Sequence, residues 1–155
     1  MELKNLKKEY AELEKKYKLP KFEDLNADFE IDKLDKESDS ILRAIRKIMM
    51  EKIVNSMSFL EMLTNPVNAP RMYMPYIRTM SAEDRKIIDD IYSSLADLSL
   101  LSLELEIDTA ENNEANLIKD VFKKWQELRQ GFRQIIASIK APKNFVNKRE
   151  KTYFG

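Results

Sequence analysis

The sequence predicts an all-α fold, an up-and-down bundle of four main helices, from three observations. Apolar residues recur three and four positions apart over long stretches, which gathers them on one face of a helix. The chain of 155 residues contains only two glycines and is 35% charged, a composition typical of long amphipathic helices. Its five prolines lie between these stretches or after the last of them, where helices are expected to stop.

The first helix is expected over residues 2–18 and should be the most peripheral of the four, because its apolar stripe is narrow. Pro20 ends it, since the residue before a proline is pushed away from helical geometry. Residues 20–36 then alternate apolar and acidic side chains, which predicts an irregular segment docked onto the bundle. As an acidic stretch with aromatic residues, the same segment could instead bind a partner.

A second helix is expected over residues 38–64, with Ser38 or Ser40 available to cap its first turn. Basic faces exposed to solvent are ordinary, so we interpret its basic strip as solvated, with nucleic-acid contact as the alternative. The strip lies largely off the broad apolar face and consists of Arg43, Arg46, Lys47 and Lys52.

Residues 65–80 contain three of the five prolines, which predicts a loop without a helix. The loop also carries apolar and aromatic side chains, among them Met72, Tyr73, Met74 and Tyr76. Packing across one end of the bundle is the first interpretation. Because Met and Tyr adapt well to contact surfaces, these four residues are also candidates for a protein interface.

A third helix is expected over residues 81–107. Ser81 can cap its first turn, and Glu83 and Asp84 suit the positive end of a helix. Toward its C-terminal end the apolar residues spread around the circumference, so this helix is either central or presents a second face to an oligomer partner. Leu103 and Leu105 are the candidates for that second face.

The fourth helix is expected over residues 109–140, with Asp108 and Glu111 at the spacing of a capping box. The short turn before it makes it an antiparallel neighbour of the third helix. Trp125 is predicted to anchor the core. Gly131 predicts close approach of a neighbouring helix, because a helical glycine costs about 1 kcal/mol relative to alanine. The apolar stripe consists of Ile118, Val121, Trp125, Leu128, Phe132, Ile135 and Ile139.

The net charge is zero but unevenly distributed. Residues 81–111 hold two basic and nine acidic side chains, a net of −7, whereas residues 112–155 hold ten basic and four acidic ones, a net of +6. The first interpretation is that the third and fourth helices are complementary neighbours. The alternative is that each block faces its own partner.

Residues 1–141 are predicted to form one domain, and residues 142–155 a basic C-terminal tail with aromatic residues. Basic residues interleaved with aromatic ones can hold single-stranded nucleic acid. The tail and the basic face of the fourth helix therefore form a candidate nucleic-acid surface. Its residues are Lys119, Lys123, Lys124, Arg129, Arg133, Lys148, Arg149 and Lys151.

The chain contains no histidine and no cysteine, which excludes the usual catalytic triads, thiolate chemistry and conventional zinc sites. With only two glycines it cannot form a glycine-rich phosphate loop. Carboxylates of the third helix could collect Mg²⁺ together with a substrate phosphate, but they more simply form its acidic face. We therefore expect no enzyme activity, no cofactor and no small-molecule substrate.

The longest apolar run, residues 95–105, is interrupted by polar side chains, so we expect no membrane span and a cytoplasmic location. The leading functional hypothesis is a non-enzymatic interaction or scaffold protein that binds a protein partner or a second copy of itself, with a homodimer as one form. Nucleic-acid binding through the basic surface is the alternative.

Overall fold

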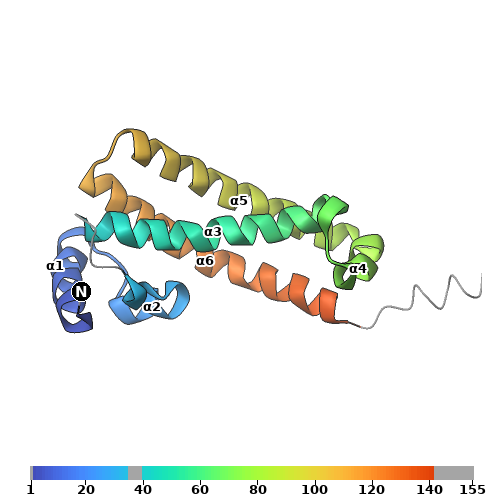
Figure 1. The fold of residues 1–155 in the computed structure, drawn as a ribbon, viewed down its shortest axis with the longest axis horizontal. Helices are drawn as coiled ribbons and strands as arrows, with labels where there is room; N and C mark the ends of the chain where they lie inside the picture. Colours follow the sequence, from blue (N-terminus) through green and yellow to red (C-terminus); the bar gives the residue numbers. More distant parts are fainter. Residues whose placement is uncertain (1, 35–39, 142–155) are drawn as a thin grey trace, which may run out of the picture.

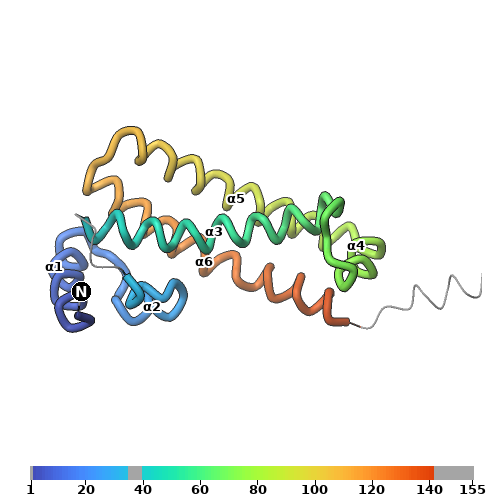
Figure 2. Tube along the Cα trace, in the orientation of Figure 1, coloured from blue at the N-terminus to red at the C-terminus, as the bar shows by residue number. Residues whose placement is uncertain are grey.

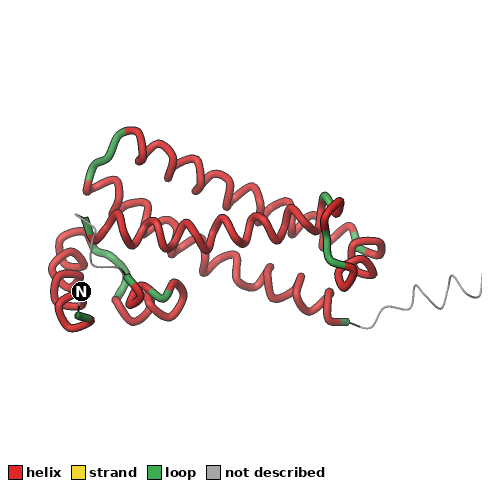
Figure 3. Tube along the Cα trace, viewed as in Figure 1, coloured by secondary structure: helices red, strands yellow, loops and turns green. Residues whose placement is uncertain are grey.

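The computed structural model describes residues 2–34 and 40–141, which form a helical bundle (Figure 1). Helix α3 (Ile41–Thr64), helix α5 (Ala82–Ile107) and helix α6 (Glu111–Lys140) each contact the other two. They run in alternating directions, as the tube in Figure 2 shows. The predicted all-α bundle is confirmed, and Figure 3 shows helices joined by short loops through the described residues.

Helix α1 (Leu3–Tyr17) lies across one end of the long helices rather than alongside them (Figure 1). Its narrow stripe buries Leu6 and Tyr10. The hydroxyl of Tyr10 donates a hydrogen bond of 2.5 Å to the carbonyl oxygen of Pro20, and burial raises the pKa of this tyrosine. The first helix is therefore attached to the bundle through few side chains, as expected for the most peripheral helix.

The segment after Pro20 is docked, and it is more regular than expected. It forms helix α2 (Phe22–Phe29) and a 3-10 turn (Ile31–Lys33). Phe22, Leu25 and Phe29 are all buried, so docking is confirmed over residues 20–34, whereas residues 35 and 36 lie outside the described residues. The aromatic residues that the alternative of partner binding would use, Phe22 and Phe29, are buried inside the protein.

The proline-rich connection between α3 and α5 contains helical structure, contrary to expectation. It forms two 3-10 turns (Pro66–Asn68 and Arg71–Tyr73) and helix α4 (Met74–Thr79). Pro75 lies in the first turn of α4, where a backbone N–H would have no intrahelical partner and a proline is tolerated. Tyr76 of α4 is buried, so the connection packs across one end of the bundle.

Serine side chains cap two of the long helices as predicted. The hydroxyl of Ser40 accepts a hydrogen bond of 3.4 Å from the amide of Arg43, and that of Ser81 accepts one of 3.0 Å from the amide of Asp84. Each bond satisfies a backbone donor that the first helical turn leaves free. Ser38, the other candidate at the start of α3, lies outside the described residues.

The predicted capping box at Asp108 is wrong. Asp108 ends α5 by donating its amide to the carbonyl oxygen of Glu104, and the hydroxyl of Thr109 donates to the carbonyl oxygen of Leu105. Helix α6 then begins after Ala110 without a side-chain cap. The chain reverses direction over residues 108–110. Asp108 therefore lies at the C-terminal end of α5, and Ala110 occupies the position before α6 that a capping residue would take.

Trp125 of α6 packs at the edge of the core rather than within it, which corrects its predicted place. It is half-buried, with its ring 5.9 Å from that of Phe29 and 5.5 Å from that of Phe132. The Nζ atom of Lys52 lies 4.8 Å from its ring centre. Helix α2 thus covers the middle of the apolar stripe of α6. In a four-helix bundle, a long helix would cover this stripe.

The close approach predicted at Gly131 is present. A Cβ atom at this position would lie 2.9 Å from Cδ1 of Ile91 and 3.3 Å from Cγ2 of Ile87, both on α5. The first distance is shorter than ordinary van der Waals contact. Glycine therefore lets the side chains of α5 pack directly against the α6 backbone.

Gly131→Val should lower the free energy of unfolding by about 1–3 kcal/mol, the usual cost of overpacking a filled contact. Valine is stiff at χ1, so its methyl groups cannot turn away from Ile87 and Ile91. Urea denaturation followed by circular dichroism measures the loss, with Gln130→Val at an exposed neighbouring position as control. Equal stability of the two variants would contradict the close approach.

Candidate functional site

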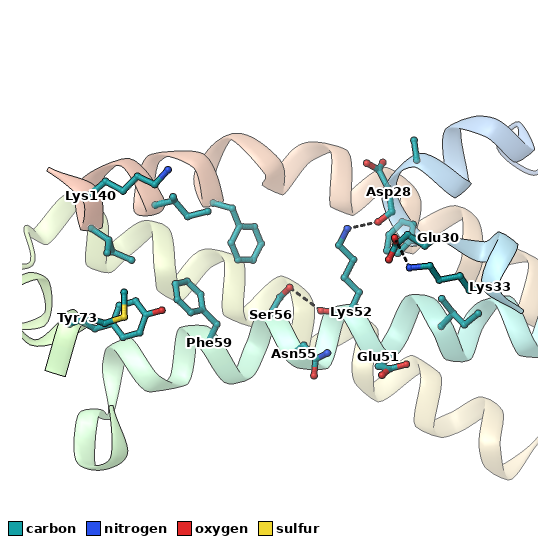
Figure 4. Close-up of a pocket in the computed structure, with 17 residues that line it drawn as sticks. Asp28, Glu30, Lys33, Glu51, Lys52, Asn55, Ser56, Phe59, Tyr73 and Lys140 are labelled. Atoms are coloured by element: carbon teal, nitrogen blue, oxygen red, sulfur yellow. Dashed lines mark hydrogen bonds and ion pairs between the residues drawn. The ribbon is translucent and has the colours of Figure 1, made fainter. Parts of the chain in front are cut away.

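A groove with a volume of about 1030 Å³ lies between α3 and α6 (Figure 4). We call it the α3–α6 groove. The C-terminal part of α2 closes it at one end, and the turn before α4 closes it at the other. Its lining residues are Ala27, Asp28, Phe29, Glu30, Lys33, Ile48, Glu51, Lys52, Asn55, Ser56, Phe59, Met72, Tyr73, Phe132, Ile136, Ile139 and Lys140.

The end of the groove beside α2 is polar and held by hydrogen bonds. Figure 4 shows Lys52 reaching from α3 to Asp28, whose carbonyl oxygen accepts from its Nζ atom. The same Nζ lies 5.4 Å from the ring centre of Phe29. Glu30 and Lys33 form an ion pair of 2.8 Å at the surface, and this pairing lowers the pKa of Glu30. Lys52 therefore ties α2 to α3 at the edge of the groove.

The opposite end is mainly apolar, with Lys140 also at this end (Figure 4). The rings of Phe59 and Tyr73 meet edge to face at 6.1 Å, and Phe132 forms the facing wall from α6. Met72 is 71% exposed and Ile136 is 43% exposed. Large apolar side chains are thus presented to solvent around a concavity, the arrangement expected of a contact surface.

The charges that line the groove nearly cancel. Three are acidic and three are lysines, all partly or fully exposed: Asp28, Glu30, Glu51, Lys33, Lys52 and Lys140. The lining of the groove therefore carries no net charge.

Helix α2 fills the other part of the same seam between α3 and α6. Its Asp28 accepts one hydrogen bond from Gln126 of α6 at 2.5 Å, and Nη1 of Arg129 of α6 lies 3.4 Å from the same carboxylate. Phe29 packs on Trp125 of α6. Helix α2 is thus already packed against both α3 and α6, and the groove begins at the C-terminal end of α2.

The predicted protein-interface residues of the 65–80 segment are only partly brought together. Met72 and Tyr73 line the groove, and Met74 is half-buried at the start of α4. Tyr76 is buried, contrary to the prediction, and its hydroxyl donates a hydrogen bond of 3.0 Å to Asp84. Burial and then this bond raise its pKa. Tyr76 therefore supports the fold and is not a contact residue.

The two interface candidates on α5 also separate. Leu103 is exposed, whereas Leu105 is buried against the core, so the prediction for Leu105 is wrong. The physical reason is the helical period: residues two apart point in directions about 200° apart. Leu103 is exposed, as are Leu100 and Ile107 on the same helix. None of these three residues lines the α3–α6 groove.

Two of the five predicted nucleic-acid residues on α6 form ion pairs within the protein. Lys124 pairs with Glu127 at 2.9 Å, and Arg129 pairs with Asp28. Lys123 and Arg133 are exposed, and Lys119 is half-buried. The remaining candidates, Lys148, Arg149 and Lys151, lie outside the described residues.

A buried ionic cluster joins all three long helices, and it was not predicted from the sequence. Arg46 of α3 is 2% exposed and Glu114 of α6 is 1% exposed. The guanidinium donates to Glu114 at 2.5 Å, to the hydroxyl of Ser102 at 2.8 Å and to Glu106 at 2.8 Å. Burial alone would lower the pKa of Arg46, but the bonds to the two glutamates outweigh it and raise the pKa.

The cluster corrects the interpretation of Arg46 as part of a solvated strip. One carboxylate oxygen of Glu114, Oε1, is buried without a hydrogen-bond partner among the described residues. Nε of Arg43 is 4.0 Å from it. At the rim, the hydrogen bond from Arg46 lowers the pKa of Glu106. Arg46, Ser102 and Glu114 are buried between the three long helices, so their hydrogen bonds link these helices to one another.

The acidic surface of α5 does not pair with α6 as the charge pattern suggested. Within residues 2–34 and 40–141, no ion pair joins these two helices.

The described residues also contain no group of three or more acidic side chains that could hold a metal ion. In the same part of the chain, no helix has both the length and the apolar character needed to cross a membrane.

Comparison of the chain with protein-family models, with curated proteins and with solved structures finds no match.

Proposed function

We propose that this chain is a non-enzymatic interaction or scaffold protein that holds an amphipathic helix of a partner protein in the α3–α6 groove. The observation that carries the proposal is the half-filled seam between α3 and α6, of which α2 covers one part and the groove is the rest. In helical bundles, such a seam is filled by another helix.

A helix is the occupant that best fits because the chain itself places one there. Helix α2 lies on the same two helices and inserts Phe29 beside Trp125. An incoming helix would continue this packing with apolar residues three and four apart, the helix-in-groove mode of recognition. Phe59, Phe132 and Ile136 offer it rings and aliphatic surface.

The balance of charge supports a protein partner over a nucleic acid at this surface. Nucleic-acid binding draws most of its free energy from cations set against phosphates. The groove is lined by equal numbers of lysines and acids, and Lys52 is already bonded to α2. The partner helix is therefore expected to carry an apolar face and little net charge.

The test is selection from a library of amphipathic helical peptides on the full-length protein. Ile136→Glu should weaken the selected peptides at least about tenfold, which corresponds to about 1.4 kcal/mol, because a carboxylate in the groove must lose its water when a helix docks. Val54→Glu is the matched control, since Val54 is 47% exposed against 43% for Ile136 and does not line the groove. Isothermal titration calorimetry measures each affinity.

Selected peptides should show apolar residues at i, i+3, i+4 and i+7, and their binding should shift the NMR signals of Phe59 and Phe132. No enrichment, or equal binding to the two glutamate variants, contradicts the proposal. Binding of RNA or DNA that survives Ile136→Glu and weakens steeply with salt would favour the nucleic-acid alternative.

A further inference from the structure

The outer surface of α5 carries an apolar ridge that no other described element covers. Leu100, Leu103 and Ile107 are 61%, 58% and 88% exposed. They follow one another at three and four residues, so they lie in one row on the helix. We call this row the α5 ridge. Such a contiguous set of exposed aliphatic side chains indicates a contact surface.

One side of the ridge is acidic. Glu104 and Asp108 lie next to it on the helix and border a pocket of about 360 Å³ between α5 and α6. Asp120 of α6 also lines this pocket. The last turn of α5 contains no basic residue, so the negative end of the helix dipole lacks the cation that usually stabilises it. Apolar ridge and negative flank together call for a partner with aliphatic or aromatic residues beside Lys or Arg.

We propose that the α5 ridge binds the C-terminal segment, residues 142–155, of a second copy of this chain. That segment combines Phe145 and Val146 with Lys148, Arg149 and Lys151, and it has a net charge of +3. Its apolar residues match the ridge, and its cations match Glu104, Asp108 and the end of α5. The surface is distinct from the α3–α6 groove, so the proposal is independent of the proposed function.

The apolar residues Phe145 and Val146 of the chain's own segment are too close to Lys140 to make the same contact within one molecule. Leu117 borders the same pocket as Glu104 and precedes Lys140 by 23 residues of α6, about 35 Å along the helix. Lys148 follows Lys140 by eight residues, which span at most about 29 Å when fully extended. Val146 follows Lys140 by only six residues, at most about 22 Å of extended chain, so Phe145 and Val146 of the same chain fall short of the ridge, and we assign the contact to a second copy.

A symmetric pairing of two α5 ridges is disfavoured by charge. It would bring the acidic flanks of both copies together, and like charges in an interface oppose association. Binding of a basic segment to an acidic ridge is instead a head-to-tail contact between two different surfaces. Such contacts continue into rings or open chains unless the geometry closes at two copies.

Sedimentation velocity of the full-length protein over a wide range of concentrations tests the proposal. The average mass should rise with concentration, and more so at low salt, because the contact is partly electrostatic. Glu104→Lys with Asp108→Lys, or Lys148→Glu with Arg149→Glu and Lys151→Glu, should each weaken association at least about tenfold. Both sets combined in one chain should restore most of it.

Two further variants separate this contact from other forms of association. Leu103→Ser should weaken it as the charge variants do, whereas Ile136→Glu in the groove should leave it unchanged. A monomer at every concentration overturns the proposal. Association that is lost in Leu103→Ser but unaffected by the three substitutions in residues 148–151 also overturns it, because it would indicate a symmetric α5 dimer.

Discussion

Replacing Arg46 by methionine should lower the free energy of unfolding by about 3–5 kcal/mol, the usual cost of removing one member of a buried ion pair. Without the guanidinium, the carboxylate of Glu114 would remain enclosed with neither oxygen satisfied by Arg46. The hydroxyl of Ser102 would lose its donor as well. For a domain of this size, the midpoint of thermal unfolding should fall by roughly 10 °C.

The matched control is Arg43→Met on the same helix. Nε of Arg43 is 4.0 Å from Glu114, and its side chain is 41% exposed, so its loss should cost less than about 1 kcal/mol. In Arg46→Met, the loss should shrink as the pH falls, because a protonated carboxyl is far less costly to bury than a carboxylate. Calorimetric scans at neutral and acidic pH measure both effects.

Adding Glu114→Leu to Arg46→Met should recover much of the lost stability, since a buried ion pair can often be replaced by apolar side chains of similar volume. The double-mutant cycle gives the coupling energy between the two side chains. If Arg46→Met and Arg43→Met were equally stable, the buried cluster would not hold the three helices together.

The limits of the main helices could be predicted from the sequence because they depend on local chemistry. Apolar periodicity, Ser40 and Ser81 as caps, and Pro20 as a stop all act within one or two turns. Pro75 was misleading for an equally local reason, because a proline is compatible with the first turn of a short helix.

A signal for the buried cluster was present in the sequence. Glu114 lies four residues before Ile118 on the α6 stripe, and Arg46 lies four residues after Leu42 on the apolar face of α3. Opposite charges on two apolar faces indicate a buried pair. Apolar periodicity does not predict how far α3 and α6 are shifted along their axes relative to each other. This shift decides whether Arg46 and Glu114 come into contact.

The groove could be predicted only in part, since it is a property of how the helices are arranged. Met72 and Tyr73 were candidates for a contact surface because of their chemistry, and both line the groove. Phe132 and Ile136 belong to it only because α2 is too short to cover the full seam between α3 and α6. No local pattern states where a covering helix ends relative to its neighbours.

Ile53→Ala should lower the free energy of unfolding by about 2–5 kcal/mol, the cost of deleting buried methyl and methylene groups together with the cavity that remains. Ile53 is completely buried at the middle of α3, the helix that contacts both α5 and α6. Chemical denaturation of the full-length protein measures the loss.

The control is the next residue, because Val54→Ala changes an exposed side chain of similar shape and should alter stability by no more than about 0.5 kcal/mol. The comparison tests more than burial. Neighbouring residues on a helix point about 100° apart, so the rotation that buries Ile53 and exposes Val54 is also the rotation that turns Lys52 and Phe59 toward the groove. Equal losses at 53 and 54 would mean that α3 is rotated, and the wall of the proposed binding groove would then be made of other residues.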